Sequence, residues 1–502
     1  VKTSSTDKDA SSAFLKYEDF SHYADYFNGM EDENIAQAIP NAKASEWMEE
    51  NIPLFECPQH NFEEMYYYRW WSLRKHIKET PVGYGMTEFL VQRSYSDKYN
   101  LIACAIGHHI YESRWLRDPK YLDQIIHTWY RGNDGGPMKK MDKFSSWNAD
   151  AVLARYMVDG DKDFMLDMAK DLETEYQRWE RTNRLKNGLY WQGDVQDGME
   201  ESISGGRKKK YARPTINSYM YGNAKALSLM GILSGDEGMA MKYGMRADTL
   251  KSLVENDLWN TRHQFFETVR IDSSANVREA IGYIPWYFNL PDTTKKYEVA
   301  WKEIMDEKGF SAPYGLTTAE RRHPEFRTRG VGKCEWDGAI WPFASAQTLT
   351  AMANFMNNYP QTVLSDSVYF RQMELYVESQ YHRGRPYIGE YLDEVTGYWL
   401  KGDQERSRYY NHSTFNDLMI TGLIGLRPRL DDTIEVNPLI PADKWDWFCL
   451  DNVLYHGHNL TILWDKNGDR YHCGKGLRVF VDGKEAGHAD TLTRLVCENA
   501  LK

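Results

Sequence analysis

The spacing of apolar residues along the chain predicts a mainly helical protein. From about residue 60 to residue 424, apolar positions recur at i, i+3 and i+4, the spacing that places them on one face of an α-helix. We interpret about twelve segments in this way. They cover approximately residues 60–79, 98–115, 119–131, 144–159, 161–182, 216–234, 236–258, 276–288, 294–307, 337–357, 362–379 and 409–424.

The connections between these segments alternate between short and long. Because consecutive antiparallel helices place alternate connections at opposite ends, the six long connections would gather at one mouth. This arrangement predicts an (α/α)6 toroid of six helical hairpins. A solenoid of helical repeats is the alternative, but we find no self-similarity with a period of about 34 or 40 residues to support it. The long connections are approximately 80–97, 132–143, 183–215, 259–275, 308–336 and 380–408.

A different pattern begins after residue 425. Apolar and polar residues alternate in the segments 433–437, 460–464 and 477–481, as they do in half-buried β-strands. The dipeptides Asn467-Gly468 and Asp482-Gly483 are typical of hairpin turns. We therefore expect three regions: an N-terminal tail and lead-in at 1–50, the (α/α)6 barrel at 51–425 and a small C-terminal β-sandwich at 426–502.

Composition limits the classes of partner that we expect for this 502-residue chain. Its net charge of −12 argues against nucleic acid or an anionic membrane as the main partner. Aromatic residues make up 14% of the chain, and aromatic faces stack on sugar rings, which favours a carbohydrate substrate. The sequence has no run of about 18 apolar residues, so we expect no membrane-spanning helix. The scattered cysteines form no Cys-x-x-Cys pair, and we expect neither a metal site nor another cofactor.

The first residues form a polar run that starts at Val1. Such a run is compatible with the segment left after removal of a signal peptide, and equally with an arbitrary boundary. Taken together with the expected carbohydrate substrate, it leads us to expect a periplasmic or secreted protein.

Four carboxylates lie close together in the third long connection. Asp194, Asp197, Glu200 and Glu201 fall within eight residues, beside Trp191. Mutual repulsion in such a cluster raises a carboxyl pKa and can keep one proton bound at neutral pH, as a general acid requires. A solvated acidic loop is the alternative interpretation.

Three other long connections combine carboxylates with aromatic residues. The first contains Arg93-Ser-Tyr-Ser-Asp-Lys-Tyr99, and the fifth leads into Trp336-Asp-Gly-Ala-Ile-Trp341. The sixth contains Gly389-Glu-Tyr-Leu-Asp393 and continues to Trp399. Acidic and aromatic side chains gathered at one mouth are the groups that bind and cleave sugars.

These motifs resemble those of the inverting glycosidases of glycoside hydrolase family 63 and, more distantly, those of the trehalases. The resemblance covers about residues 80–425. The family's Ser-Gly-(Trp/Met)-Asp element, which carries the general acid, resembles Asp197-Gly-Met-Glu200, so that Glu200 takes the place of the acid. The general base of the family lies in a Glu-x-Tyr-x-x-x-Thr-Gly-like element, which Glu390 matches with Thr396-Gly397 downstream.

Two further elements of the family bind the sugar. Its aromatic-x-Trp-Asp-x-aromatic element is similar to residues 95–99, where a serine replaces the tryptophan. Its Tyr-Trp-Arg-Gly-Pro-(Ile/Val)-Trp element is similar to residues 335–341, where an aspartate replaces a sugar-contacting arginine. We therefore expect the substrate-binding residues to be Tyr95, Asp97, Tyr99, Asp197, Glu201, Trp336, Asp337, Trp341 and Tyr391.

The resemblance implies an (α/α)6 barrel that cleaves a terminal glycosidic bond of an oligosaccharide or glycan with inversion, in an α-glucosidase-like activity. Inversion needs a protonated carboxyl that gives its proton to the leaving oxygen, and an ionised carboxyl that activates water. Glu200 and Glu390 would face each other across the mouth in these two roles. We expect Asp197 and Glu201 to keep the proton on Glu200. This mechanism requires no metal or cofactor.

Each assignment has an alternative. A phosphorylase on a similar toroid needs no carboxylate base, because phosphate is itself the nucleophile. A non-catalytic glycan-binding protein would keep the aromatic residues and need neither carboxylate. At the level of residues, the alternatives are Asp197 or Glu201 as the acid, Asp393 or Glu394 as the base, a helix cap for Asp97 and Asp337, and a core position for Trp336 and Trp341.

Overall fold

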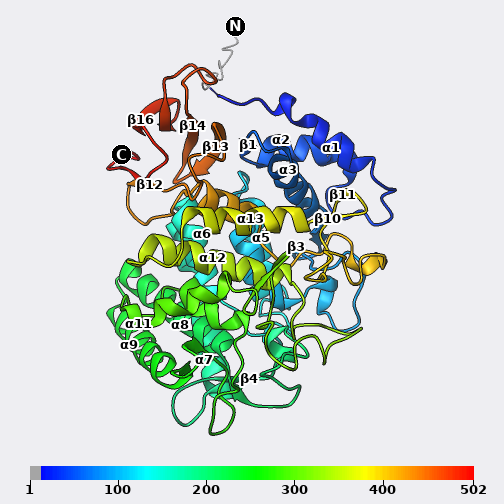
Figure 1. Ribbon diagram of the computed structural model, residues 1–502, viewed down its shortest axis with the longest axis vertical. Coiled ribbons are helices and arrows are strands. Elements are labelled where there is room, and N and C mark those ends of the chain that lie inside the picture. The colour runs from blue at the N-terminus through cyan, green and yellow to red at the C-terminus, as the bar shows by residue number, and fades with distance from the viewer. Residues whose placement is uncertain (1–12) are drawn as a thin grey trace.

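Helices dominate the chain up to about residue 425, and strands follow (Figure 1). The computed structural model describes residues 13–502, so the polar run at 1–12, part of the predicted tail, lies outside the described residues. The prediction of a mainly helical protein with a strand-rich C-terminal region is confirmed. Over residues 13–502, the chain contains no helix with both the length and the apolar character that a membrane span requires.

Each predicted helical segment contains a helix. Two of them, 276–288 and 294–307, hold only short α-helices and 3-10 turns. In the first, Asn276 has a left-handed backbone (φ 55°), so helical structure begins only at Ala280. The helices are α3 (His60–Lys75), α4 (Ile106–Ser113), α5 (Lys120–Arg131), α6 (Asn148–Asp159), α7 (Lys162–Asn183), α8 (Pro214–Ser234), α9 (Glu237–Leu253), α10 (Ile284–Tyr287), α11 (Lys295–Glu298), α12 (Pro342–Asn358), α13 (Asp366–Ser379) and the π-helix η10 (Leu418–Leu423).

Helix α8 illustrates how sequence sets the position of a helix. Pro214 occupies its first turn, and Gly235 ends it with φ 76°. A Cβ added at Gly222 would lie 2.2 Å from the Phe288 ring, and one added at Gly231 would lie 2.5 Å from a backbone nitrogen of α9. Small residues therefore let α8 pack closely against α9 and the segment after α10. An apolar surface on most sides of a helix is typical of a buried helix, and α8 contacts α6, α7, α9 and α10.

The helices contact one another in an alternating order. Helix α4 packs on α6, α6 on α8, α8 on α10, α10 on α12 and α12 on η10. The Glu112 carboxylate of α4 in turn accepts hydrogen bonds from the backbone N–H groups of Phe415, Asn416 and Asp417, just before η10. Arg114, directly after α4, forms an ion pair of 2.8 Å with Asp417. Every second helix, together with η10, therefore lies in one continuous chain of contacts.

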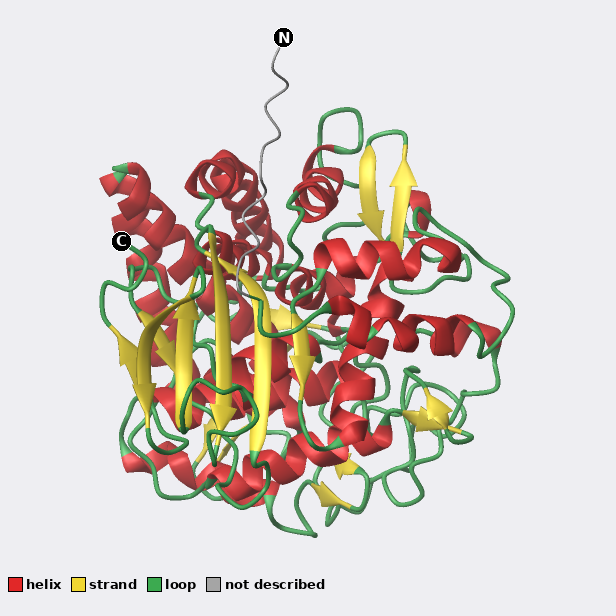
Figure 2. Ribbon diagram, turned by 90° about the horizontal axis from the view of Figure 1, so that it is seen from above, coloured by secondary structure: helices red, strands yellow, loops and turns green. Residues whose placement is uncertain are grey.

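The C-terminal region contains a five-stranded antiparallel sheet in the order β1-β13-β14-β15-β16 (Figure 2). Its edge strand β1 comes from the other end of the chain. The predicted strands at 460–464 and 477–481 lie in β14 and β15, and the one at 433–437 lies in β12, which pairs with β17 as a separate ladder. The strands are β1 (Leu54–Glu56), β12 (Ile434–Val436), β13 (Trp447–Tyr455), β14 (His458–Asp465), β15 (Gly476–Val481), β16 (Lys484–Ala489) and β17 (Leu495–Cys497).

The segment predicted as a lead-in is folded from residue 13 onward. It forms α1 (Ser21–Asn28) and α2 (Ala44–Asn51), both of which contact α3. Tyr23, Phe27 and Trp47 are buried in this packing. Together with β1, the segment joins the helical region to the C-terminal sheet.

Candidate active site

Glu200 and Glu390 come from two long connections that meet in the structure. Glu200 follows the 3-10 helix η5 (Val195–Asp197), after Gly198 reverses the chain with φ 73°. Glu390 follows the hairpin of β10 (Tyr381–His382) and β11 (Arg385–Pro386). The negative charge of Glu390 raises the pKa of Glu200. The two predicted carboxyls are therefore close enough for the charge of one to act on the other.

Glu200 lies in surroundings that keep a proton on it. Burial is the main cause, and the charges of Glu390 and Asp194 add to it, so that the pKa of Glu200 rises to about 7. Asp197 and Glu201, which were predicted to keep this proton bound, are not among the main influences on the pKa of Glu200. Glu201 forms an ion pair with Arg207, and Asp194 takes the expected role instead.

Asp197 is a structural residue. It is 2% exposed, and its Oδ2 accepts hydrogen bonds from Arg213 Nε at 2.6 Å and from the Thr215 hydroxyl at 2.5 Å. Its Oδ1 accepts a hydrogen bond from Ser145. Both of its oxygens are therefore engaged in holding the Glu200 connection against α8, and its predicted contact with substrate stays a prediction.

Glu390 has the opposite electrostatic surroundings to Glu200. It is 6% exposed, and burial raises its pKa above the usual value, although the positive charges of Lys401, Arg406 and Arg93 reduce this rise. Among residues 13–502, its Oε2 has no hydrogen-bond donor, and Lys401 Nζ lies 3.9 Å from this oxygen. A buried carboxylate oxygen that faces cations and remains unbonded is available to a water or a substrate.

A third carboxyl near Glu200 and Glu390 belongs to Glu88, which was not among the residues predicted from the sequence. It lies two residues after β3 (Gly83–Met86) and is 5% exposed. Burial raises its pKa to about 8, the Tyr410 side chain lowers it, and the charges of Glu390 and Glu200 raise it further. In the sequence, Glu88 was one of two carboxylates in the long connection at 80–97, and unlike Asp97 it had no motif around it.

Three of the five predicted aromatic residues, Trp336, Trp341 and Tyr391, form one stack. Trp336 and Trp341 have ring centres 4.3 Å apart, and Trp341 and Tyr391 have ring centres 5.1 Å apart with nearly parallel planes. All three are at most 3% exposed. The Tyr391 hydroxyl donates to the Lys333 carbonyl at 2.6 Å. The stack is thus mainly a buried wall that carries Glu390, the residue before Tyr391.

In the first long connection, the charges of two carboxyls act on Tyr95, whereas Asp97 fixes the loop. Tyr95 is 37% exposed, and its pKa rises to about 12 through burial and through the charges of Glu88 and Glu390. Asp97 instead caps the 3-10 helix η3 (Lys98–Asn100) and also accepts from the Lys140 N–H. Tyr99 has a left-handed backbone (φ 63°) within η3. The structure therefore brings Tyr95 close to the carboxyls and uses Asp97 to fix the loop.

Asp337 and Arg327 organise the connection that precedes α12. Asp337 is fully buried, and its Oδ2 accepts from the N–H groups of Arg329 at 2.6 Å and Gly330 at 3.0 Å. Arg327 forms ion pairs with Glu335, with Asp393 and with Glu394. The two alternative bases, Asp393 and Glu394, are therefore engaged in ion pairs that join this connection to the one carrying Glu390.

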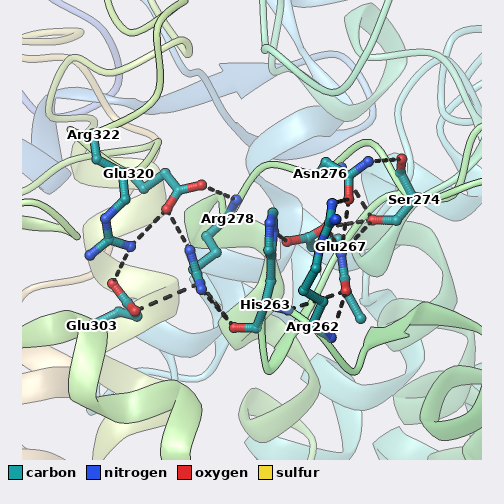
Figure 3. A network of polar contacts seen from close by, with 10 residues as sticks. Arg262, His263, Glu267, Ser274, Asn276, Arg278, Glu303, Glu320 and Arg322 are labelled. Carbon is teal, nitrogen blue, oxygen red and sulfur yellow. Dashed lines mark hydrogen bonds and ion pairs between the residues drawn. The ribbon is translucent and has the colours of Figure 1, made fainter.

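A further polar network lies beside the segment that follows Glu200. Figure 3 shows His263 paired with Glu267 at 2.6 Å and Arg278 paired with Glu320 at 2.8 Å. The residue next to Arg278, Glu279, accepts hydrogen bonds from the backbone N–H groups at 203 and 204. The network therefore anchors the segment that follows Glu200 to the connection after α9.

Comparisons with known proteins identify the family of this chain. Residues 98–413 match the family described as "Mannosylglycerate hydrolase MGH1-like glycoside hydrolase domain", and residues 426–488 match the "Glycosyl hydrolase family 65, C-terminal domain". A solved structure named "Sialidase" is 97% identical, with a TM-score of 0.98, and the match covers 100% of this chain and 46% of that one. The chain therefore spans less than half of the length of that protein.

Two more distant structures share the fold. The GH63 mannosylglycerate hydrolase from Thermus thermophilus, solved in complex with glucose, is 13% identical with a TM-score of 0.53. That match covers 71% of this chain and 99% of the other. The GH78 family rhamnosidase of Bacillus sp. GL1 is 11% identical with a TM-score of 0.56, over 86% of this chain and 41% of the other.

Proposed function

Because the chain belongs to the family of mannosylglycerate hydrolase MGH1-like glycoside hydrolase domains, we propose that it cleaves a terminal glycosidic bond of an oligosaccharide or glycan with inversion. Glu200 is the general acid and Glu390 the general base. The observation that carries this proposal is the contrast between their surroundings. At Glu200, the charges of Glu390 and Asp194 add to the rise in pKa that burial causes, whereas at Glu390 three cations oppose that rise.

The charges around the two carboxyls match the two roles. Glu200, with a pKa of about 7, holds a proton over much of the neutral range and donates it to the oxygen of the leaving group. Glu390, on which the positive charges of Lys401, Arg406 and Arg93 act, accepts a proton from water. The water oxygen then bonds to the anomeric carbon on the face opposite the departing oxygen, which inverts the anomer. Such a water needs carboxyls about 6.5–9.5 Å apart.

Glu88 and Tyr95 complete the proposed sugar site. With a pKa of about 8, Glu88 is mostly neutral at pH 7 and donates a hydrogen bond to a sugar hydroxyl. Tyr95 is partly exposed at the same mouth and offers an aromatic face to the sugar ring. The buried stack of Trp336, Trp341 and Tyr391 positions Glu390.

We also propose that the helical region is an (α/α)6 toroid. The chain of contacts from α4 through α6, α8, α10 and α12 to η10 supports an inner ring. The hydrogen bonds that the Glu112 carboxylate accepts and the ion pair of Arg114 with Asp417 would link its two ends. The remaining helices would form the outer ring, as the contacts of α7 and α9 with α8, and of α13 with α12, suggest.

The test is product analysis with a panel of α- and β-glycosides that includes mannosylglycerate, the compound after which one structural neighbour is named. Proton NMR in the first minutes identifies the anomer formed. We expect the opposite anomer from the substrate. Release of the same anomer would overturn inversion and require a nucleophile about 5 Å from the acid. Turnover only with added phosphate would favour a phosphorylase, and sugar binding without turnover of any glycoside would favour a glycan-binding protein.

A further inference from the structure

A tight turn at residues 330–333 lies in the connection that precedes α12. The Lys333 N–H donates to the Gly330 carbonyl at 2.7 Å, which closes the turn. Gly332 has φ 75°, the positive value that the third residue of a type II turn requires. We call residues 328–334, which contain this turn, the bridging loop.

The bridging loop is bonded to the connections of both proposed catalytic residues. Arg329 Nη1 donates to the carbonyls of residues 202–203 at 3.1 and 3.0 Å, directly after the connection's acid. At the other end of the loop, the Lys333 carbonyl accepts the hydrogen bond of the Tyr391 hydroxyl at 2.6 Å, and Tyr391 follows the proposed base. The loop therefore spans the distance between the two connections.

The base of the bridging loop is fixed. The buried Asp337 carboxylate accepts hydrogen bonds from the N–H groups of Arg329 and Gly330. A Cβ added at Gly330 would lie 2.3 Å from the Cys334 carbonyl oxygen, so the two ends of the turn pack closely. Such a base holds the tip of the loop at a defined place, as a preorganised binding surface requires.

The tip of the loop presents an apolar side chain to solvent. Val331 is 67% exposed, and among residues 13–502 no atom except those of its chain neighbours lies within 4 Å of a Cβ added at Gly332. Cys334, at the end of the loop, is partly exposed. Burial and then the charges of Glu200 and Glu390 raise the pKa of its thiol to about 12. The exposed tip therefore stands at the rim of the site that contains both carboxyls.

We propose that Val331 contacts the leaving group of the substrate and selects leaving groups with an apolar face. This inference rests on the proposed function. The terminal sugar must reach Glu200 and Glu390, which are half-buried and buried, so the rest of the substrate extends towards the rim. The loop is bonded to the segment just after the acid, and the acid lies on the leaving-group side of the scissile bond.

The chemistry of the tip defines the leaving group that it accepts. The side chain of Val331 offers two methyl groups and neither a donor nor an acceptor of hydrogen bonds. It therefore suits the C–H face of a sugar ring or another apolar ring, and gains nothing from a leaving group without carbon.

The test compares three leaving groups on the sugar that the product analysis identifies. They are fluoride, methanol and cyclohexanol, of which only the last has a ring about as large as that of a sugar. We would measure kcat and KM for the unaltered chain and for Val331→Ala, Val331→Asp and Val331→Ile. Val496→Ala is the matched control, because Val496 is an exposed valine in β17. Thermal unfolding shows whether each variant is folded.

We expect Val331→Ala to lower kcat/KM for the cyclohexyl glycoside about fivefold relative to the fluoride, mainly through a higher KM. Val331→Asp should lower it roughly tenfold or more, because a charge would lose its hydration at the contact. Val331→Ile and Val496→Ala should leave the ratio unchanged. If folded Val331→Ala and Val331→Asp affected all three leaving groups equally, or none, the inference would be overturned and the proposed function would stand. If the unaltered chain turned over no glycoside, both would be overturned.

Discussion

The Lys401 ammonium lies 3.9 Å from Glu390 Oε2 and 5.1 Å from the centre of the Tyr391 ring. The same cation therefore contacts the proposed base and the residue that follows it. Burial raises the pKa of Glu390, and Lys401 is the strongest of the influences that lower it. The positive charge of Lys401 thus opposes the effect of burial on the pKa of the Glu390 carboxyl.

Lys401→Met should move the acidic limb of the pH profile. Without the cation the pKa of Glu390 rises, so the ionised base is lost at a higher pH as the solution is acidified. We expect the acidic limb of log kcat/KM to shift upward by roughly 1 pH unit or more. Lys466→Met is the control, because Lys466 pairs with Asp446 on the surface at 3.1 Å. If the acidic limb did not move in Lys401→Met, Glu390 would not be the general base.

Asp194→Asn should move the basic limb in the opposite direction. The acid must be protonated, so activity should fall as the pH rises through about 7, the pKa of Glu200. The charge of Asp194 raises that pKa, and its removal should shift the basic limb of kcat/KM to lower pH. Glu201→Gln is the adjacent control, since Glu201 pairs with Arg207, and should leave the limb in place. If Asp194→Asn left the basic limb unchanged, the assignment of Glu200 as the general acid would be contradicted.

Glu200→Gln should lose activity in a way that depends on the leaving group. We expect a loss of about 10²–10⁴ in kcat/KM for alkyl glycosides, the usual contribution of a general acid. A dinitrophenyl glycoside should lose far less, because its leaving group departs without a proton. Glu88→Gln is the decisive comparison, since Glu88 also has a raised pKa. If only Glu88→Gln showed this dependence on the leaving group, Glu88 would be the acid.

Arg213→Met should destabilise the fold. Arg213 and Asp197 form an ion pair of 2.6 Å in which both side chains are 0% exposed. Removing one partner leaves a buried charge without compensation, and we expect a loss of about 3–5 kcal/mol in the free energy of unfolding. The partly exposed pair of Arg207 and Glu201 is the control, and Arg207→Met should cost about 1 kcal/mol or less. Equal effects in urea denaturation would refute the structural role of Asp197.

The period of the apolar residues predicted the helices well because each helix must turn one stripe of side chains towards the core. It overestimated the helices at 276–288 and 294–307, where Asn276 and a succession of 3-10 turns interrupt the α-helix. Alternation predicted the positions of β12, β14 and β15, for a similar reason. Nothing in the local pattern indicated that β1, a three-residue strand, would pair with β13 across almost 400 positions of sequence.

The sequence by itself determined the mainly helical architecture, the strand-rich C-terminus and two carboxyls, Glu200 and Glu390, on long connections. Only the tertiary structure decided which carboxyls of the acidic cluster form ion pairs with cations. It pairs Asp197 with Arg213 and leaves Glu200 half-buried and under the influence of the Glu390 charge. It also brought in the contributors without a motif, Glu88, Lys401 and Arg406. The physical reason is that a pKa depends on burial and on charges within a few ångströms, and here those charges come from connections far apart in the sequence.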